Sequence, residues 1–173
     1  MKKIVFFFLL IAINSLAQND LNHLLKKYNT ANIPYISVDS LNSLLKTSFD
    51  ITQDENSIIL LDAREEKEFM TSHLQGAKFV GYDTFNIKKT SEDLPNKNAK
   101  IVVYCSLGIR SEEVAEKLTK AGYTDVFNLY GGIFEWKNNG YLVYNSNGKE
   151  TEKVHIYKQE WAKWLLKGEK IDE

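Results

Sequence analysis

Three short apolar runs constrain the fold of this 173-residue chain most strongly. They occupy residues 58–61, 101–104 and 126–129. None of them alternates apolar with polar residues, so each is typical of a strand buried on both faces, as in a parallel sheet. Segments with helical patterning, 65–71 and 111–121, follow the first two runs. This order predicts an α/β fold with a central parallel sheet flanked by helices.

The first 17 residues have the pattern of a secretory signal peptide. Lys2 and Lys3 precede an apolar run at 4–13, and a Ser-Leu-Ala sequence ends at Ala17. The run is shorter than the about 20 apolar residues that a membrane-spanning helix needs. We therefore expect cleavage after Ala17 and an exported protein, periplasmic or secreted, without a stable membrane anchor. Loss of two lysines would take the net charge from -1 to -3.

The remainder of the chain divides into three parts. Residues 18–34 form a polar N-terminal extension, with a short amphipathic helix predicted at 20–28. Residues 35–144 carry the predicted strands and form the main domain. Residues 145–173 form a C-terminal extension, whose apolar side chains fall at helical spacing and predict an α-helix: Tyr157, Trp161, Trp164 and Leu165.

The start of the main domain has its own local signals. A short strand is predicted at 35–38 and a helix at 41–46. Asp39 or Ser40 is expected to cap that helix, because both residue types accept hydrogen bonds from a helix N-terminus. Residues 50–57 are polar and predict a turn.

Cys105 is the only cysteine of the chain, so an internal disulfide is excluded. It directly follows the run at 101–104 and stands at the carboxyl end of a predicted strand, where open parallel sheets bind their ligands. Two interpretations of this thiol are open. Free cysteines are often small buried core residues. A reactive cysteine instead needs surroundings that stabilise a thiolate.

The residues after Cys105 favour the reactive interpretation. A tight loop that leads into a helix turns backbone N–H groups inward, and with the helix dipole they favour an anion at the loop centre. We therefore expect the pKa of Cys105 to lie below the free value of about 8.5. Gly108 permits the turn, Arg110 adds positive charge, and Ser111 is expected to cap the following helix.

Motifs along residues 35–144 resemble those of one family. The loop from Cys105 to Ser111 resembles the active-site loop of single-domain rhodaneses. Further segments are similar to the first signature and the closing segment of that family: Leu61-Asp62-Ala63-Arg64, Glu68-Phe69, His73-Leu74-Gln75-Gly76-Ala77, Ala121-Gly122-Tyr123, Leu129-Tyr130-Gly131-Gly132 and Trp136. The resemblance implies a rhodanese-like three-layer fold, in which helices flank both faces of a parallel sheet.

The resemblance also implies a sulfurtransferase without a cofactor. Cys105 would attack a small sulfane-sulfur donor and carry the sulfur as a persulfide, and a thiol, cyanide or protein acceptor would then remove it. The rest of the active-site loop would hold the persulfide: Ser106, Leu107, Gly108, Ile109, Arg110 and Ser111. Asp62 and Arg64 are expected to support the strand end as an ion pair, and His73 to be a structural residue.

Ser106 and Leu107 depart from the family pattern, because many members carry a basic residue directly after the cysteine. The departure argues against thiosulfate as the donor, and it leaves a rhodanese-like binding module and a sulfur-relay partner open as alternatives. A cysteine-dependent phosphatase is disfavoured. Four residues separate Cys105 from Arg110, whereas the loops of those enzymes are one residue longer, and a shorter loop suits sulfur better than a phosphoryl group.

Two further classes of ligand are not expected. The three histidines and one cysteine lack the spacing of metal ligands, so the sequence predicts no metal site. A net charge of -1 and a pI near 6.3 give no electrostatic reason to expect a nucleic-acid partner.

Overall fold

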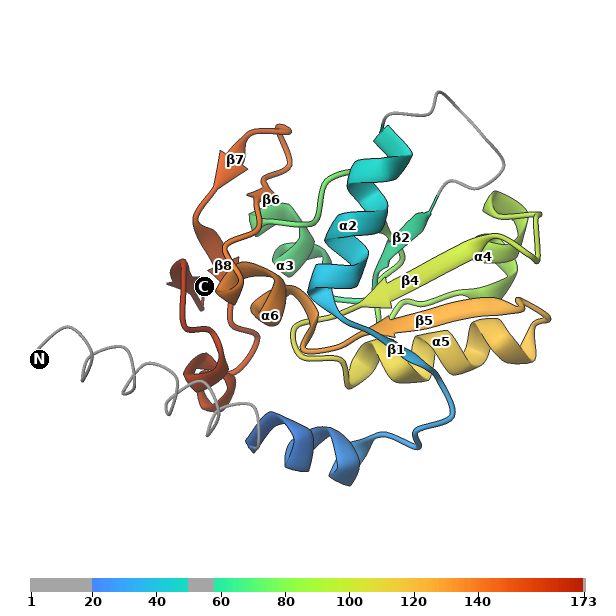
Figure 1. The fold of residues 1–173 in the computed structure, drawn as a ribbon, viewed down its shortest axis with the longest axis horizontal. Coiled ribbons are helices and arrows are strands. Elements are labelled where there is room, and N and C mark those ends of the chain that lie inside the picture. Colours follow the sequence, from blue (N-terminus) through green and yellow to red (C-terminus); the bar gives the residue numbers. More distant parts are fainter. Residues whose placement is uncertain (1–19, 50–57, 173) are drawn as a thin grey trace, which may run out of the picture.

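The fold is a three-layer α/β structure around one parallel sheet (Figure 1). The computed structural model describes residues 20–49 and 58–172. The predicted signal peptide and the predicted turn at 50–57 lie outside these residues. Five parallel strands form the sheet in the order β1-β5-β4-β2-β3. Their bounds are β1 Tyr35–Ile36, β2 Ile59–Asp62, β3 Lys78–Phe79, β4 Lys100–Tyr104 and β5 Asp125–Leu129.

Helices cover both faces of this sheet. Their bounds are α2 Val38–Phe49, α3 Glu66–Thr71, α4 Ile87–Asp93, α5 Arg110–Lys120 and α6 Gly132–Asn138. In Figure 1, α2 and α5 lie on opposite sides of the sheet. The N-terminal extension contributes a helix at 20–28, as predicted from its amphipathic pattern. The α/β prediction with a central parallel sheet is confirmed.

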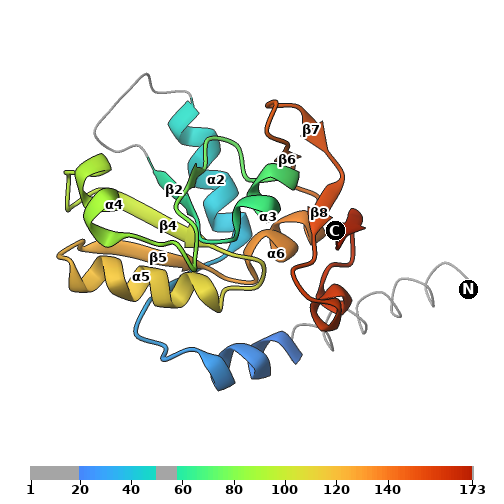
Figure 2. The same cartoon turned by 180° about the vertical axis from the view of Figure 1, so that it is seen from behind.

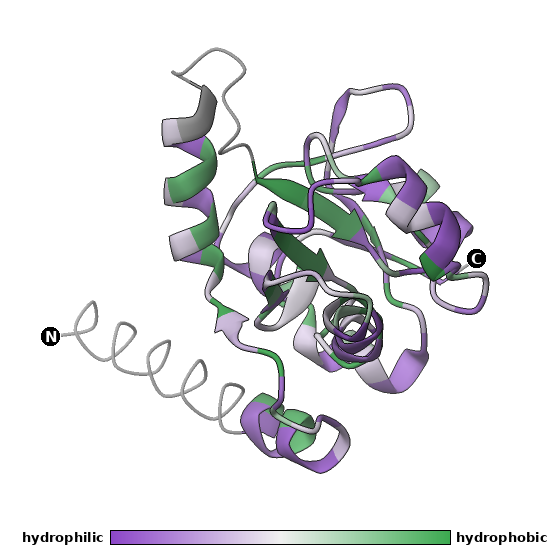
Figure 3. Cartoon of the chain, turned by 90° about the vertical axis from the view of Figure 1, so that its right-hand side faces the viewer, coloured by the Kyte–Doolittle hydropathy of each residue, from purple (hydrophilic) through white to green (hydrophobic). Residues whose placement is uncertain are grey.

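The apolar runs form the central strands because both faces of the sheet are buried. On β4, Val102 and Tyr104 enter the hydrophobic cluster on one face, and Ile101 and Val103 enter the cluster on the other. Figure 3 shows the central strands as hydrophobic along their length, whereas the helices combine polar and apolar residues. A strand with two buried faces requires a continuous apolar run, which explains the sequence pattern.

The prediction for the cap of α2 is wrong in its position. Ser37, rather than Asp39 or Ser40, accepts the backbone N–H of Ser40 with its hydroxyl oxygen at 3.1 Å. The helix begins at Val38, three residues before the predicted start. The strand before it is correspondingly shorter than predicted and ends at Ile36. A serine that precedes the first helical residue can reach the free N–H groups of the first turn, which explains the earlier start.

The C-terminal extension is not the single α-helix expected from its periodicity. It contains the 3-10 helix η1 Gln159–Trp164 and three short strands: β7 Glu150–Thr151, β8 Lys153–His155 and β9 Glu169–Ile171. Strand β6 Val143–Tyr144 lies just before it. Strand β8 pairs in parallel with β9. Tyr157 has a left-handed backbone with φ +64°, and an α-helix cannot run through that conformation. Trp164 and Leu165 of this set are buried in the hydrophobic core instead, and Trp161 packs against it.

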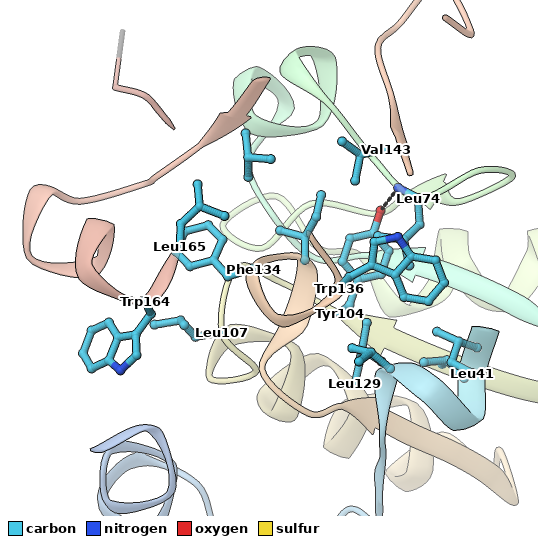
Figure 4. Close-up of a cluster of buried hydrophobic side chains, with 14 of the residues drawn as sticks. Leu41, Leu74, Tyr104, Leu107, Leu129, Phe134, Trp136, Val143, Trp164 and Leu165 are labelled. Carbon is cyan, nitrogen blue, oxygen red and sulfur yellow. Dashed lines mark hydrogen bonds between the residues drawn. The ribbon is translucent and has the colours of Figure 1, made fainter. Parts of the chain in front are cut away.

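The extension nevertheless belongs to the main hydrophobic core. Trp164 and Leu165 are buried in one cluster with Leu107, Leu129 and Phe134 (Figure 4). Within the described residues, no helix combines the length and the apolar character needed to cross a bilayer.

Neighbouring leucines test whether the extension is part of the fold. Leu165 is 0% exposed and Leu166 is 49% exposed. We expect Leu165→Ala to lower the free energy of unfolding by about 2–5 kcal/mol, because it leaves a cavity in the core. Leu166→Ala is the matched control and should change it by about 0.5 kcal/mol or less. Urea denaturation measures both. Equal effects would show that the extension does not pack as described.

Candidate active site

The candidate nucleophile lies at the carboxyl edge of the sheet. Cys105 follows β4 and begins the loop that leads into α5. Its side chain is fully buried, with an exposed fraction of 0%. Of the predicted loop residues, Gly108 and Ser111 contact this sulfur. The sulfur lies in the position expected for a ligand site of an open parallel sheet.

Two donors contact the sulfur directly. The backbone N–H of Gly108 lies 3.1 Å from Sγ, and the hydroxyl of Ser111 lies 3.5 Å from it. Burial alone would raise the pKa of Cys105. The positive charge of Arg110 and the hydrogen bonds from Ser111 and Gly108 outweigh burial and lower the pKa. The site therefore favours a thiolate, as the sequence predicts.

The first two carbonyl groups of the loop are held away from its centre. Helix α6 donates its Ile133 N–H to the Cys105 carbonyl at 2.9 Å and its Phe134 N–H to the Ser106 carbonyl at 3.2 Å. In a planar trans peptide the N–H points opposite to the C=O. The N–H groups of Ser106 and Leu107 are thus directed to the other side, toward the loop centre.

Gly132 makes this approach of α6 possible. Its φ is +55°, and a Cβ atom at this position would overlap the carbonyl oxygen of Cys105. Only glycine combines this backbone conformation with contact between two main chains. The Gly131-Gly132 pair of the sequence therefore has a structural role at the active-site loop.

Ser111 does not cap α5, contrary to the sequence prediction. The helix begins at Arg110, and Ile109 occupies the cap position without a side-chain hydrogen bond. The single proton of the Ser111 hydroxyl is instead shared between Asn128 Oδ1 at 2.8 Å and the sulfur at 3.5 Å. Sequence reasoning missed Asn128, although a buried asparagine inside the apolar run 126–129 was an available signal.

Arg110 forms a buried ion pair with Glu68 of α3. Its two terminal nitrogens lie 2.7 and 2.8 Å from the two carboxylate oxygens, and its side chain is 4% exposed. Burial would raise the pKa of Glu68, but hydrogen bonds and charge from Arg110 outweigh burial and lower it. Arg110 thus holds the loop on α3, and its guanidinium is already engaged by a carboxylate.

The C-terminal extension completes the surroundings of Arg110. The ring centroid of Tyr157 lies 3.9 Å from the guanidinium carbon. The Tyr157 N–H donates to Nδ1 of the buried His155 at 3.0 Å, and burial lowers the pKa of that histidine. No sequence motif pointed to these two residues, because the contact of Tyr157 with Arg110 joins segments distant in the chain.

The two residues that depart from the family pattern are both turned inward. The Ser106 hydroxyl donates to Glu68 Oε1 at 2.9 Å and accepts a hydrogen bond from Arg110 at 3.0 Å. Leu107 is fully buried and lies in the same cluster as Trp164 of η1 (Figure 4). The loop uses these positions to bind α3 and the C-terminal extension.

The predicted support residues lie beside the strand that precedes α3. Arg64 forms an ion pair with Asp62 at 2.7 Å and donates to the Ser72 carbonyl at 2.5 Å. The ring of His73 stacks on Phe69 with centroids 4.1 Å apart, and its Nδ1 lies 3.0 Å from the Phe69 carbonyl. Across the part of the chain that the structure describes, no group of three or more His, Cys, Asp or Glu side chains could hold a metal ion.

The parallel sheet and the cysteine loop at its edge define the class of protein. Among solved structures, the chain resembles thiosulfate sulfurtransferase from Pseudomonas aeruginosa, with a TM-score of 0.56 and 23% identity over 68% of this chain and 21% of that chain. It also resembles the BH2092 protein from Bacillus halodurans, with a TM-score of 0.56 and 22% identity over 76% of this chain and 88% of that chain. At such identities the likeness shows the fold.

The family model of the rhodanese-like domain matches residues 46–139, more than half of the chain. The chain belongs to the rhodanese-like domain family, as its motifs predicted. A curated relative, tRNA uridine(34) hydroxylase from Oceanobacillus iheyensis, is 37% identical over 93 residues. The match covers 51% of this chain and 28% of that protein, so the chain spans little more than a quarter of its relative.

Two glycines with similar backbones test the contact between α6 and the loop. Gly132→Ala should lower the free energy of unfolding by about 3 kcal/mol or more, because the methyl group overlaps the loop backbone. Gly148 has φ +70° and open space around it. Gly148→Ala should therefore cost only the backbone strain, about 1–2 kcal/mol. Urea denaturation of both variants measures the difference, and equal losses would contradict the close approach.

Proposed function

We propose that this protein is a sulfurtransferase that moves a sulfane sulfur from a donor to a thiophilic acceptor through a persulfide on Cys105. The observation that carries the proposal is the donor groups at the sulfur: the Gly108 N–H lies 3.1 Å from it, and the Ser111 hydroxyl, whose single proton is shared with Asn128 Oδ1, lies 3.5 Å from it. Such donors stabilise negative charge on sulfur, which both halves of the reaction require.

The two half-reactions need no external oxidant or reductant. The Cys105 thiolate attacks the outer sulfur of the donor, the donor's bond to that sulfur breaks, and the remainder of the donor leaves with the electron pair. The acceptor, a thiolate or cyanide, then attacks the outer sulfur of the persulfide, and the Cys105 thiolate leaves. The chain has no second cysteine to resolve the persulfide, so the acceptor must be another molecule.

The surroundings of the loop bear on the choice of donor. Arg110 is neutralised by Glu68, and Ser106 and Leu107 supply no positive charge at the loop. An anionic donor such as thiosulfate gains little attraction there, whereas the persulfide group of a small thiol or of a protein carries at most one negative charge, against the two of thiosulfate. We therefore favour a persulfide donor. In the exported protein that the predicted signal peptide implies, this chemistry would take place outside the cytoplasm.

Modification of tRNA is not proposed for this chain. The relatives named tRNA uridine(34) hydroxylase are much longer proteins, and the match with this chain covers 28% of the length of one of them. In addition, a net charge of -1 offers little attraction for RNA. A phosphatase reaction is also disfavoured by the four-residue spacing from Cys105 to Arg110. A binding module and a sulfur-relay partner stay as alternatives that the following experiment separates.

Incubation with sulfane donors tests the proposal. Mass spectrometry should show one added sulfur on the peptide that contains Cys105, and cyanide or a small thiol should remove it. A persulfide of glutathione should load the protein faster than thiosulfate does. Cys105→Ser should abolish loading while leaving the unfolding curve within about 1 kcal/mol of the parent, because the swap is nearly isosteric.

Each contrary outcome has a defined meaning. Sulfur transfer that persists in Cys105→Ser protein would exclude the persulfide mechanism. Absence of loading with every donor would favour the binding module. Loading that only a protein acceptor can discharge would favour the relay partner.

A further inference from the structure

A third carbonyl group of the loop is also held away from its centre, here by side chains. The Gly108 carbonyl oxygen accepts the Asn128 side-chain amide at 2.8 Å and the Asn29 side-chain amide at 2.8 Å. The Gly108–Ile109 peptide is planar and trans, so its N–H points opposite to this carbonyl. Two asparagines thus direct the Ile109 N–H away from the side chains that bind this carbonyl, in a loop whose preceding N–H, that of Gly108, lies 3.1 Å from the sulfur.

Because residue 108 is a glycine, the peptide that follows it needs these hydrogen bonds to keep one orientation. Gly108 has φ +107°, a region that only glycine adopts readily. The same freedom lets the following peptide rotate at small cost in energy. Hydrogen bonds to its carbonyl oxygen therefore determine which way the Ile109 N–H points, and a single remaining bond would hold the peptide less firmly than two.

We propose that Asn29 is a positioning residue for sulfur transfer, which holds the Gly108–Ile109 peptide so that its N–H faces the sulfur of Cys105. Asn29 lies in the N-terminal extension, outside the segment 46–139 that the family model matches. The proposal rests on the proposed function, and it makes the extension part of the active site.

Several contacts fix the extension beside the loop. Leu25 is buried, and its Cδ2 would lie 3.7 Å from a Cβ atom at Gly108. Asp20 forms an ion pair with Lys163 of η1 at 2.8 Å, and Figures 1 and 2 both show helix 20–28 next to that C-terminal segment. The helix is thereby held in place, so the side chain of Asn29 is presented to the loop at a defined position.

The structure supplies a matched control for Asn29. Its amide also donates to the Tyr35 hydroxyl at 2.6 Å. Asn29→Ala removes both hydrogen bonds, whereas Tyr35→Phe removes only the bond to the hydroxyl and leaves the bond to Gly108. A comparison of the two variants assigns an effect to the loop carbonyl alone.

The readout is the pH midpoint for alkylation of Cys105 by iodoacetamide, followed by mass spectrometry of its peptide. This midpoint reports the thiolate and does not depend on how easily the reagent enters. Asn29→Ala should raise it by about 0.5 pH unit, since a hydrogen bond that favours the charged form becomes weaker. Tyr35→Phe should leave it within about 0.2 unit of the parent value. Circular dichroism and urea denaturation establish that both variants fold.

An unchanged midpoint in folded Asn29→Ala protein would overturn the proposal, as would an equal rise in Tyr35→Phe. If Asn29→Ala failed to fold, Asn29→Leu would take its place, because it removes the donor, keeps a similar side-chain size and adds no charge. A midpoint equal to the parent's would again contradict the role. Failure of the proposed sulfurtransferase function can be told apart from failure of this proposal. In that case the parent protein would form no persulfide with any donor, whatever the pH midpoint of its alkylation.

Discussion

The active-site loop depends on the buried ion pair between Arg110 and Glu68. The Glu68 carboxylate binds both terminal nitrogens of Arg110, the Ser106 hydroxyl, and the N–H of Glu65 at the start of α3. Arg110 in turn supports the ring of Tyr157. One carboxylate thus connects a helix from the first half of the domain, the loop and the C-terminal extension. Removal of either partner of such a pair leaves an uncompensated buried charge and costs about 3–5 kcal/mol.

This arrangement determines how the sulfur is stabilised. Because Glu68 neutralises Arg110, the loop has little net attraction for a distant anion, yet the nearby guanidinium still lowers the pKa of Cys105. Backbone N–H groups supply the rest, and they point inward because the carbonyl groups of Cys105, Ser106 and Gly108 are bound on the outside. Preorganised dipoles of this kind act over short distances in a dry site. This arrangement suits a charge that stays on sulfur throughout the proposed reaction.

The sequence predicted the parts of the fold whose signals are local. The apolar runs predicted the central strands, and the cysteine, glycine and arginine of one loop predicted the candidate nucleophile and its surroundings. The contributions of Asn29 and Tyr157 could not be read in the same way, because each contacts the loop through tertiary packing and neither belongs to a local motif. Asn128 did carry a signal, as a polar residue inside an apolar run, but its partners come from tertiary packing as well. The prediction of an α-helix in the C-terminal extension was wrong for a related reason. The left-handed backbone at Tyr157 and the pairing of β8 with β9 override the helical spacing of the apolar residues.

The central claim is that the folded loop stabilises a thiolate on Cys105 despite its complete burial. The ultraviolet absorbance of the thiolate, titrated against pH with Cys105→Ser protein as the baseline, measures this most directly. The structure predicts a single transition with a midpoint below the free-cysteine value of about 8.5, and a return to about that value on unfolding in urea. A midpoint in the folded protein at or above the unfolded value would show that burial dominates, and would contradict the account.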